Sequence, residues 1–212
     1  MNSAVKVKIN KMELNEQVCN LRGAALESKV AKIVKEEYFY PAVYGMIDDF
    51  ENHPVTREIE GGIDSENLSN TLRGKFKNDN GKNLFSFIGF LAGTNPIAEI
   101  RQFFDPKHKD GPKCKLESTN KKRLLFNFKI TPPDIESIYK NSPMPWATGM
   151  SWVRRIEIGI PGLGRFLNKI GAKNSRSGGG VQIKHELRSA RFSPVQYLSE
   201  IFNRFLKNIQ KS

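Results

Sequence analysis

Two stretches of the chain alternate apolar and polar residues, which is the pattern of a β-strand with one buried face. Residues 4–9, AVKVKI, place aliphatic residues between lysines, and residues 123–131, RLLFNFKIT, place large apolar residues on one face. A third, mostly apolar run, LFSFIGFLAG at 84–93, is also strand-like and ends on a glycine. These runs predict a small, mainly antiparallel sheet.

Other stretches repeat their apolar residues with the period of an α-helix. Residues 13–40 carry one apolar face with charges opposite, and Pro41 is expected to break or restart this helix. The stretch SWVRRIEIGIPGLGRFLNKIG is amphipathic, with an expected kink at Pro161. A short helix is expected in PPDIESIYK. A C-terminal helix is expected at about 194–210, with Ser193 as its N-cap.

The region between the first helices and the apolar run at 84–93 has a different composition. Residues 52–83 are rich in Gly, Asn, Asp and Ser and indicate a long, partly extended arm. A chain of 212 residues is long enough for one well-buried core. We therefore predict a compact, single α+β domain over residues 1–212, with a small sheet, flanking helices and long extended arms or loops.

Positive charge is concentrated in the last third of the chain. The formal net charge is +12, and residues 138–212 hold 13 Lys and Arg against 3 Asp and Glu, a net of +10. A field of this kind attracts polyanions or an acidic protein surface. A solvated basic face is the alternative, because charge concerns association and not fold.

The stretch GAKNSRSGGGVQIKHELRSARFSP at 171–194 is the most distinctive part of this basic third. Its three consecutive glycines lack the following lysine that a phosphate-binding P-loop requires. The other glycine cluster, GIPGLG at 159–164, does not have the spacing of a dinucleotide-binding turn. We therefore expect no nucleotide cofactor.

The chain offers few residues that suggest catalysis. GMSWV around Ser151 begins like a nucleophile elbow, but Val153 stands where the second glycine is required. DPKHKDGPK at 105–113 is interpreted as a solvated turn, because its lysines would oppose a metal cation. The acids at 48–51 suggest a distant third possibility, a metal-dependent nuclease. We predict a protein that is not an enzyme, with no catalytic residue, metal or cofactor.

Aromatic residues that lie between cations in the sequence can be interpreted as a nucleic-acid-binding surface or as part of the core. Phe76, Phe85, Phe87 and Phe90 interleave with lysines and an arginine, as in a surface on which nucleic-acid bases stack. The run around Phe85 is mostly apolar, which favours core packing.

Cysteine usage and hydropathy bear on the compartment. Cys19 and Cys114 lie far apart and indicate neither a disulfide framework nor a metal-binding pair. No apolar run is long enough to span a bilayer, and the N-terminus shows no signal peptide. We expect synthesis in the cytoplasm of the producing cell and no membrane partner.

Four phrases of the sequence carry a resemblance to a class of viral proteins. They are ENHPVTREIEGG, SNTLRGKF…KNLFSFIGF, NSPMPWATGMSWVRRIEIGIPGLGRFL and NSRSGGGVQIKHELRSARFSP. Together they resemble the layout of small virion proteins from tailed bacteriophages, namely the neck and tail-completion proteins related to the minor tail components. The resemblance covers most of residues 40–200.

This resemblance implies a non-enzymatic structural protein of the virion, located in its tail or neck. Such proteins form rings around the genome passage at the head–tail junction or the tail terminus, with about six or twelve copies in a closed ring. The implied partners are further copies of the chain, other neck, connector or tail proteins, and the genomic DNA in the channel. The alternative is a sequence-nonspecific nucleic-acid-binding protein that uses the basic C-terminal third.

In such a protein the glycine-rich loop at about 171–181 would be a docking element. Gly178, Gly179 and Gly180 allow a flexible backbone that orders on assembly. The cations expected to contact carboxylates of a partner, or DNA phosphates, are Arg176, Lys184, Arg188 and Arg191. The alternative is a flexible linker with incidental charge.

Overall fold

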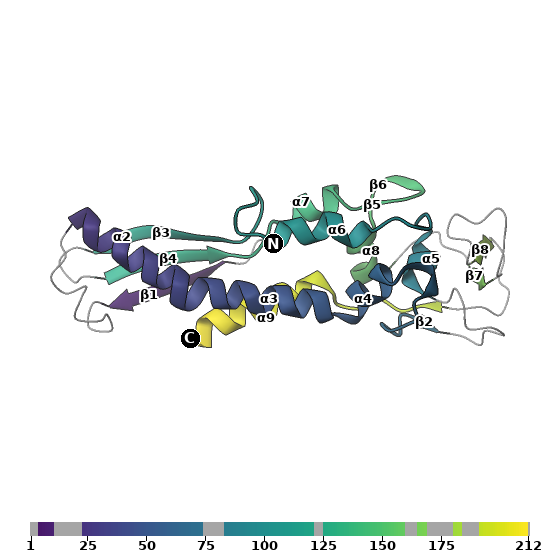
Figure 1. The fold of residues 1–212 in the computed structure, drawn as a ribbon, viewed down its shortest axis with the longest axis horizontal. Helices are drawn as coiled ribbons and strands as arrows, with labels where there is room; N and C mark the ends of the chain where they lie inside the picture. Colours follow the sequence, from purple (N-terminus) through teal and green to yellow (C-terminus); the bar gives the residue numbers. More distant parts are fainter. Residues whose placement is uncertain are drawn as a thin grey trace. The chain divides into compact units, whose positions relative to one another are not determined.

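A computed structural model gives the fold of the chain. The structure describes residues 4–10, 23–73, 83–120, 125–159, 165–168, 180–183 and 191–211. Helices and a small antiparallel sheet occur together in these residues, which confirms the predicted α+β class (Figure 1).

The chain divides into two compact units, each assembled from segments that are distant in sequence. Unit 1 consists of residues 1–48, 103–134 and 201–212, and unit 2 of residues 49–102 and 135–200. Three of the four divisions, after Asp48, Gln102 and Glu200, fall inside helical segments, and the fourth, after Asp134, falls directly before a helix that begins at Ile135. Composition, from which we expected one domain, does not mark these divisions.

Unit 1 contains the main sheet, whose strand order is β1-β4-β3. The strands are β1 (Val5–Asn10), β3 (Lys113–Asn120) and β4 (Leu125–Thr131), all antiparallel. In the centre of the sheet, Val7 of β1 and Leu116 of β3 both lie opposite Phe128 of β4. The predicted strands at 4–9 and 123–131 are thereby confirmed, whereas β3 was not predicted because its sequence, KCKLESTN, is mostly polar.

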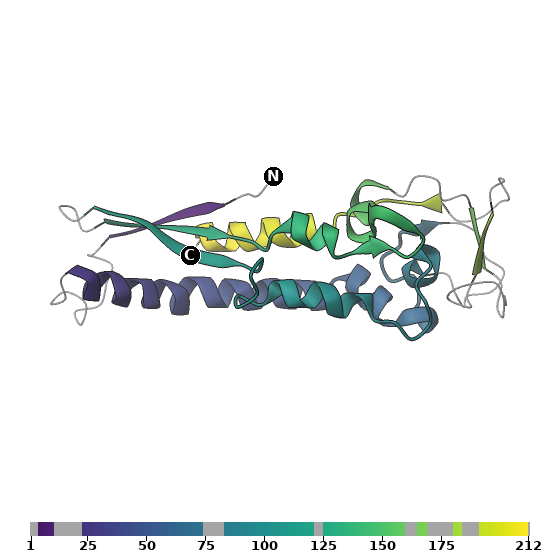
Figure 2. The ribbon, with the colours of Figure 1, turned by 90° about the horizontal axis from the view of Figure 1, so that it is seen from above.

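One helix covers a face of this sheet and forms a hydrophobic core with it (Figure 2). Helix α2 (Gly23–Val34) points Leu26, Val30 and Val34 at the sheet, four residues apart on one helical face. These side chains pack with Phe126 and Phe128 of β4, and all five are buried. The burial of each such side chain is worth roughly 1.5–3 kcal/mol relative to exposure.

The predicted break at Pro41 is a change of helical register and not an interruption. Residues Lys35–Phe39 form a π-helical turn, η2, followed directly by α3 (Tyr40–Asn52). The Tyr40 N–H donates to the Lys35 carbonyl, five residues back. Because a proline lacks an N–H and its ring collides with the carbonyl four residues back, the wider turn accommodates Pro41 without ending the helix.

Unit 2 begins with short helical segments, which corrects two predictions. Within its described residues, 52–73 and 83, the expected arm contains α4 (Pro54–Glu60), η3 (Gly62–Asp64) and a short strand, β2 (Leu72–Arg73). The expected strand at 84–93 is instead α5 (Leu84–Ile88), whose five residues are all buried. Asn83 caps α5 by accepting the Ser86 N–H, and Gly89 ends it at φ 86°. A short apolar run does not distinguish a buried strand from a buried helix.

The second half of unit 2 alternates short helices with hairpins. Its elements are α6 (Pro96–Arg101), α7 (Ile135–Lys140), β5 (Pro143–Met144), β6 (Ala147–Ser151), α8 (Trp152–Ile158), β7 (Arg165–Asn168), β8 (Gly180–Ile183) and β9 (Arg191–Phe192). The strands pair antiparallel as β5–β6, β7–β8 and β2–β9. The short helix expected in PPDIESIYK is confirmed as α7. Helix α8 ends at Gly159 with φ 96°, before Pro161, so the expected kink is replaced by an end.

The C-terminal helix is confirmed, with a later start than predicted. Helix α9 spans Leu198–Lys211, and its apolar stripe is buried: Leu198, Ile201, Phe202, Phe205, Leu206 and Ile209. Ser193 is not its N-cap, because α9 begins five residues later, at Leu198. The Ser193 N–H donates instead to the Thr71 carbonyl. The start of α9 is held instead by Glu157 of α8, whose Oε1 accepts the Tyr197 and Ser199 N–H groups at 3.1 and 2.8 Å. The 3-10 segment η4 (Gln102–Phe104) directly follows α6.

Candidate binding pocket

The residues predicted for docking lie mostly outside the described part of the chain. This holds for Arg176, Gly178, Gly179, Lys184 and Arg188. Two others have a described backbone. Gly180 pairs with Asn168 in the β7–β8 hairpin, and Arg191 pairs with Arg73 in the β2–β9 ladder. The docking role of the glycine-rich loop stays a prediction.

A pocket of about 480 Å³ lies in unit 2, within the basic C-terminal third. Its walls come from α7, the β5–β6 hairpin and α8. The lining residues are Glu136, Tyr139, Lys140, Pro143, Gly149, Met150, Ser151, Arg154, Arg155 and Ile158. We call this the basic pocket. Its volume is in the range of sites that bind small molecules or single side chains of a partner.

Buried serines hold the two walls of the basic pocket together. Ser142 follows α7 and Ser151 precedes α8, and their Oγ atoms are 2.7 Å apart in a buried hydrogen bond. Ser151 Oγ also accepts the Arg154 N–H and caps α8, while the Trp152 N–H donates to the Ser142 carbonyl. These bonds fix the start of α8, and with it the positions from which Arg154 and Arg155 extend.

The pocket carries three cations for which the described part of the chain provides no acidic partner. Among the described residues, no ion pair joins Lys140, Arg154 or Arg155 to a carboxylate. The guanidinium carbon of Arg154 lies 5.8 Å from the centre of the Tyr139 ring, an arrangement in which the ring face attracts the cation. Uncompensated cations around a concavity favour an anionic ligand.

The phenol of Tyr139 remains neutral beside these cations. Burial, and next the nearby Glu157 carboxylate, raise the pKa of Tyr139 to about 12. Its ring and the exposed side chain of Ile158, 58% accessible, add apolar surface to the pocket. The pocket therefore suits a ligand with a negative charge on a partly apolar body.

Sequence reasoning did not single out this pocket. Lys140 and the Arg154–Arg155 pair are separated by a hairpin and show no motif spacing. The available signal was the high net charge of residues 138–212, within which we chose the glycine-rich loop instead.

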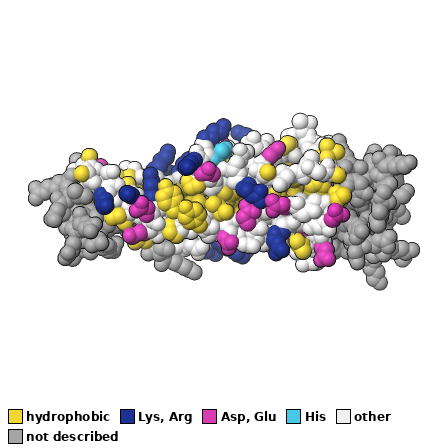
Figure 3. Space-filling view, viewed as in Figure 1, with side chains coloured by type: hydrophobic (Ala, Val, Ile, Leu, Met, Phe, Trp, Pro, Cys, Tyr) yellow, Lys and Arg dark blue, Asp and Glu magenta, His cyan; other side chains and the backbone are white. Residues whose placement is uncertain are grey.

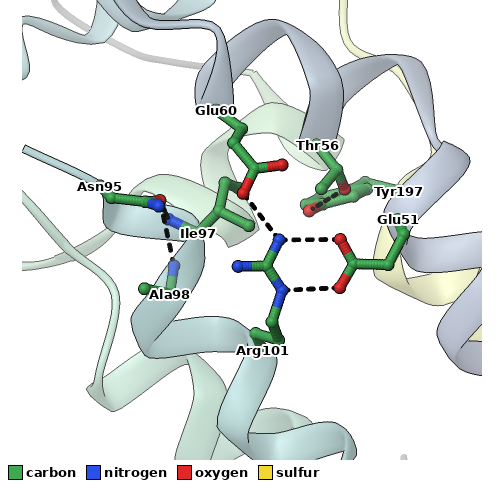
Figure 4. Close-up of polar contacts among 8 residues, drawn as sticks. All are labelled: Glu51, Thr56, Glu60, Asn95, Ile97, Ala98, Arg101 and Tyr197. Carbon is green, nitrogen blue, oxygen red and sulfur yellow. Dashed lines mark hydrogen bonds and ion pairs between the residues drawn. The ribbon is translucent and has the colours of Figure 1, made fainter.

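A second polar cluster in unit 2 is structural (Figure 4). Arg101, at the end of α6, forms two hydrogen bonds with Glu51: Nε to Oε1 at 2.6 Å and Nη2 to Oε2 at 2.8 Å. Arg101 Nη2 also donates to Glu60 of α4 at 2.7 Å. These bonds raise the pKa of Arg101 and fasten three helices. Because Glu51 is occupied by Arg101, it is poorly suited to serve as a nuclease metal ligand.

The other candidate residues also have structural partners. Asp105 Oδ1 accepts the Lys107 N–H, and His108 Nδ1 accepts the Asp110 N–H, so both stabilise their own turn. Within the described ranges, no group of three or more His, Cys, Asp or Glu residues is placed to hold a metal ion. Phe85, Phe87 and Phe90 are buried, which supports the core-packing interpretation of these aromatic residues.

The chain matches no family model, no curated protein and no solved structure. In the described part of the chain, no helix has both the length and the apolar character needed to cross a membrane. The chemistry of the basic pocket is thus interpreted from its own geometry and charge.

Proposed function

We propose that this chain is a non-enzymatic structural protein of a tailed-bacteriophage virion. In this proposal it is a ring-forming subunit at the head–tail junction or the tail terminus, where it joins connector and tail. The four sequence phrases that resemble neck and tail-completion proteins suggest this class. The observation that carries the proposal is the basic pocket, whose arginines, tyrosine and exposed isoleucine are typical of a protein interface.

A second exposed surface, in unit 1, supports an assembly role. Hydrophobic side chains gather over the first part of α3 (Figure 3). Tyr44 of this helix is 67% accessible, and Pro41 and Gly45 beside it are also exposed. Contiguous exposed apolar residues of this kind mark interaction sites in proteins that assemble.

The proposed partners are copies of the same chain in a cyclic ring, with other neck, connector or tail proteins next to it. A closed ring uses heterologous contacts, in which a surface of one subunit meets a different surface of the next. The cations of residues 138–212 face either an acidic protein surface or the phosphates of DNA in the channel.

Quantitative mass spectrometry of purified phage particles tests the proposal. Copies of this chain per particle are counted against a major capsid protein in the same sample. We expect a low fixed number, about six or twelve as cyclic rings require. Hundreds of copies would indicate a tube or shell component, and absence from clean particles would overturn the structural role.

The runner-up function is sequence-nonspecific nucleic-acid binding. The observation that favours it is the set of cations in the basic pocket, which form no ion pair with a carboxylate of the described residues. Such a protein would bind duplex DNA as a free chain, and its affinity would fall steeply with salt. A ring subunit would instead bind duplex weakly until the ring concentrates its charges.

A further inference from the structure

An acidic loop in unit 2 matches the basic pocket in charge. Residues 61–70 connect α4 to β2, and their side chains alternate between exposed and half-buried. Asp64, Glu66 and Leu68 are exposed, with Leu68 39% accessible. The loop thus presents two carboxylates and an apolar side chain along one side. We call residues 61–70 the acidic loop.

The acidic loop is held from its inner side and does not need a partner to keep its shape. Asn67 Nδ2 donates to the Leu72 carbonyl at 2.7 Å, across the base of the loop. The buried Glu58 accepts the Ser69 N–H at 2.8 Å, and Ser69 Oγ lies 2.9 Å from Thr71 Oγ1. A preformed loop loses little conformational freedom on binding, which favours its use as a contact.

The exposed carboxylates of this loop have no cationic partner among the described residues. Neither Asp64 nor Glu66 forms an ion pair there. The acidic loop therefore presents two carboxylates and a leucine, and the basic pocket presents cations and Ile158. The two surfaces are complementary in charge, and each has an exposed apolar side chain. Arginine binds a carboxylate through two parallel hydrogen bonds, and Ile158 supplies an apolar contact for Leu68.

The loop and the pocket lie on different sides of unit 2. In both views, α4 and the segment after it lie across the unit from α7 and the β5–β6 hairpin (Figures 1 and 2). The acidic loop is thus placed to meet the pocket of another copy and not its own. A contact between two different surfaces of identical chains is heterologous and generates a ring when the rotation closes.

We propose that the acidic loop of one copy docks into the basic pocket of the next copy. Asp64 and Glu66 then pair with Lys140, Arg154 and Arg155, and Leu68 packs against Ile158. This inference rests on the proposed ring-forming function and names the contact that would build the ring. The occupant of the pocket is a second copy of this chain.

The shape of the pocket favours this occupant over duplex DNA. A concavity of about 480 Å³ accepts individual side chains, whereas a duplex presents a broad convex surface of regularly spaced phosphates. Met150 and Ile158 add apolar surface that a phosphate backbone does not use.

Reciprocal charge reversal tests this contact. The pocket variant carries Arg154→Glu and Arg155→Glu, and the loop variant carries Asp64→Lys and Glu66→Lys. Sedimentation velocity over a range of protein concentrations at low salt measures self-association of the full chain. We expect the wild type to associate and each variant alone to lose association about tenfold or more, because like charges then meet. An equimolar mixture should recover it, since each reversed site then meets an opposite charge.

Further variants separate charge from folding. Lys107→Glu with Lys109→Glu changes the net charge as the pocket variant does, on an exposed turn of unit 1, and should leave association unchanged. Circular dichroism melting checks that each variant is folded. If the pocket variant does not fold, Arg154→Gln with Arg155→Gln removes the charges and keeps long polar side chains. This substitute should weaken association as well.

Several outcomes would overturn the inference. They are a wild type that stays monomeric at the highest concentration, variants that associate as the wild type does, and a mixture that does not recover. If the pocket variant loses duplex DNA affinity while its self-association is unchanged, the pocket is a nucleic-acid contact instead. If any of these results is found together with a low fixed copy number in particles, the proposed function is supported and only the proposed contact is refuted. Absence from particles would remove the function itself.

Discussion

At the scale of single residues, the most informative side chain is a buried carboxylate. Glu58 of α4 is fully buried, with 0% of its surface accessible. Its Oε1 accepts the Leu84 N–H at 2.7 Å and its Oε2 accepts the Ser69 N–H at 2.8 Å. One side chain thereby joins α4 to the start of α5 and to the end of the acidic loop. A buried carboxylate is tolerated because both oxygens have donors.

We predict that Glu58→Gln destabilises the protein by about 1–3 kcal/mol, because the amide group cannot accept from both backbone donors. Chemical denaturation measures the change. Glu66→Gln, at an exposed position of the same loop, is the control and should alter stability by less than about 0.5 kcal/mol. Equal losses in the two variants would contradict this role of Glu58.

The difference in stability between the wild type and Glu58→Gln should depend on pH. Burial is the main cause that raises the pKa of Glu58 above its ordinary value of 4.5, although its hydrogen bonds act in the opposite direction. A raised pKa means that the folded state binds the proton more tightly than the unfolded state. The stability of the wild type relative to Glu58→Gln should thus fall as pH rises from 4.5 through the raised pKa, and then level off. A difference that grows with pH would contradict the raised pKa.

At the scale of elements, α2 and β4 form the core of unit 1. Phe128 lies at the centre of the sheet between β1 and β3 and is 1% accessible. We predict that Phe128→Ala lowers the free energy of unfolding by about 3–5 kcal/mol, because it leaves a cavity under α2. The control is Lys129→Ala on the exposed face, for which we expect about 0.5 kcal/mol or less. Thermal or denaturant unfolding checks both, and a loss below about 1 kcal/mol for Phe128→Ala would mean that the core is elsewhere.

Strands β7 and β8 flank most of the predicted docking loop in the sequence, and their bounds decide which residues a deletion can remove without shortening a strand. Removing residues 175–179 shortens the segment between the strands and leaves β8, which begins at Gly180, intact. We predict a folded protein that fails to enter particles, because the docking element is lost. Particle composition and DNA ejection are measured against particles with the full-length chain. Normal incorporation and ejection would refute the docking role of the loop.

At the scale of the whole molecule, continuous helices join the two units. The division at Asp48 falls within α3 and the division at Glu200 falls within α9. At these two divisions a helix connects the units, so a change of composition typical of a linker does not mark them. Its charge is also organised at this scale, because the net +10 of residues 138–212 exceeds the +2 of the rest. The proposed contact uses both signs of charge within unit 2 alone.

Predictions from the sequence succeeded where the repeat of apolar residues fits only one kind of secondary structure. The alternation in β4 and the stripe of α9 repeat over seven or more residues, so each pattern identified its element. They failed at α5, where five apolar residues fit a buried strand as well as a buried helix. They also failed at α4, because turn-forming residues on both sides concealed a short helix that His53 caps by accepting the Val55 N–H.

Local patterning was therefore enough to establish the α+β class, the main strands and the amphipathic helices, because these follow from neighbouring residues. The basic pocket depends on contacts between distant residues. Lys140 reaches the same concavity as Arg154 and Arg155 because the β5–β6 pairing and the Ser142–Ser151 hydrogen bond close the hairpin between them. The exposure of Asp64 and Glu66 likewise depends on the inner bonds of Asn67 and Glu58. Tertiary packing decides which charged side chains form ion pairs and which remain exposed to solvent, because only folding brings residues that are distant in sequence together.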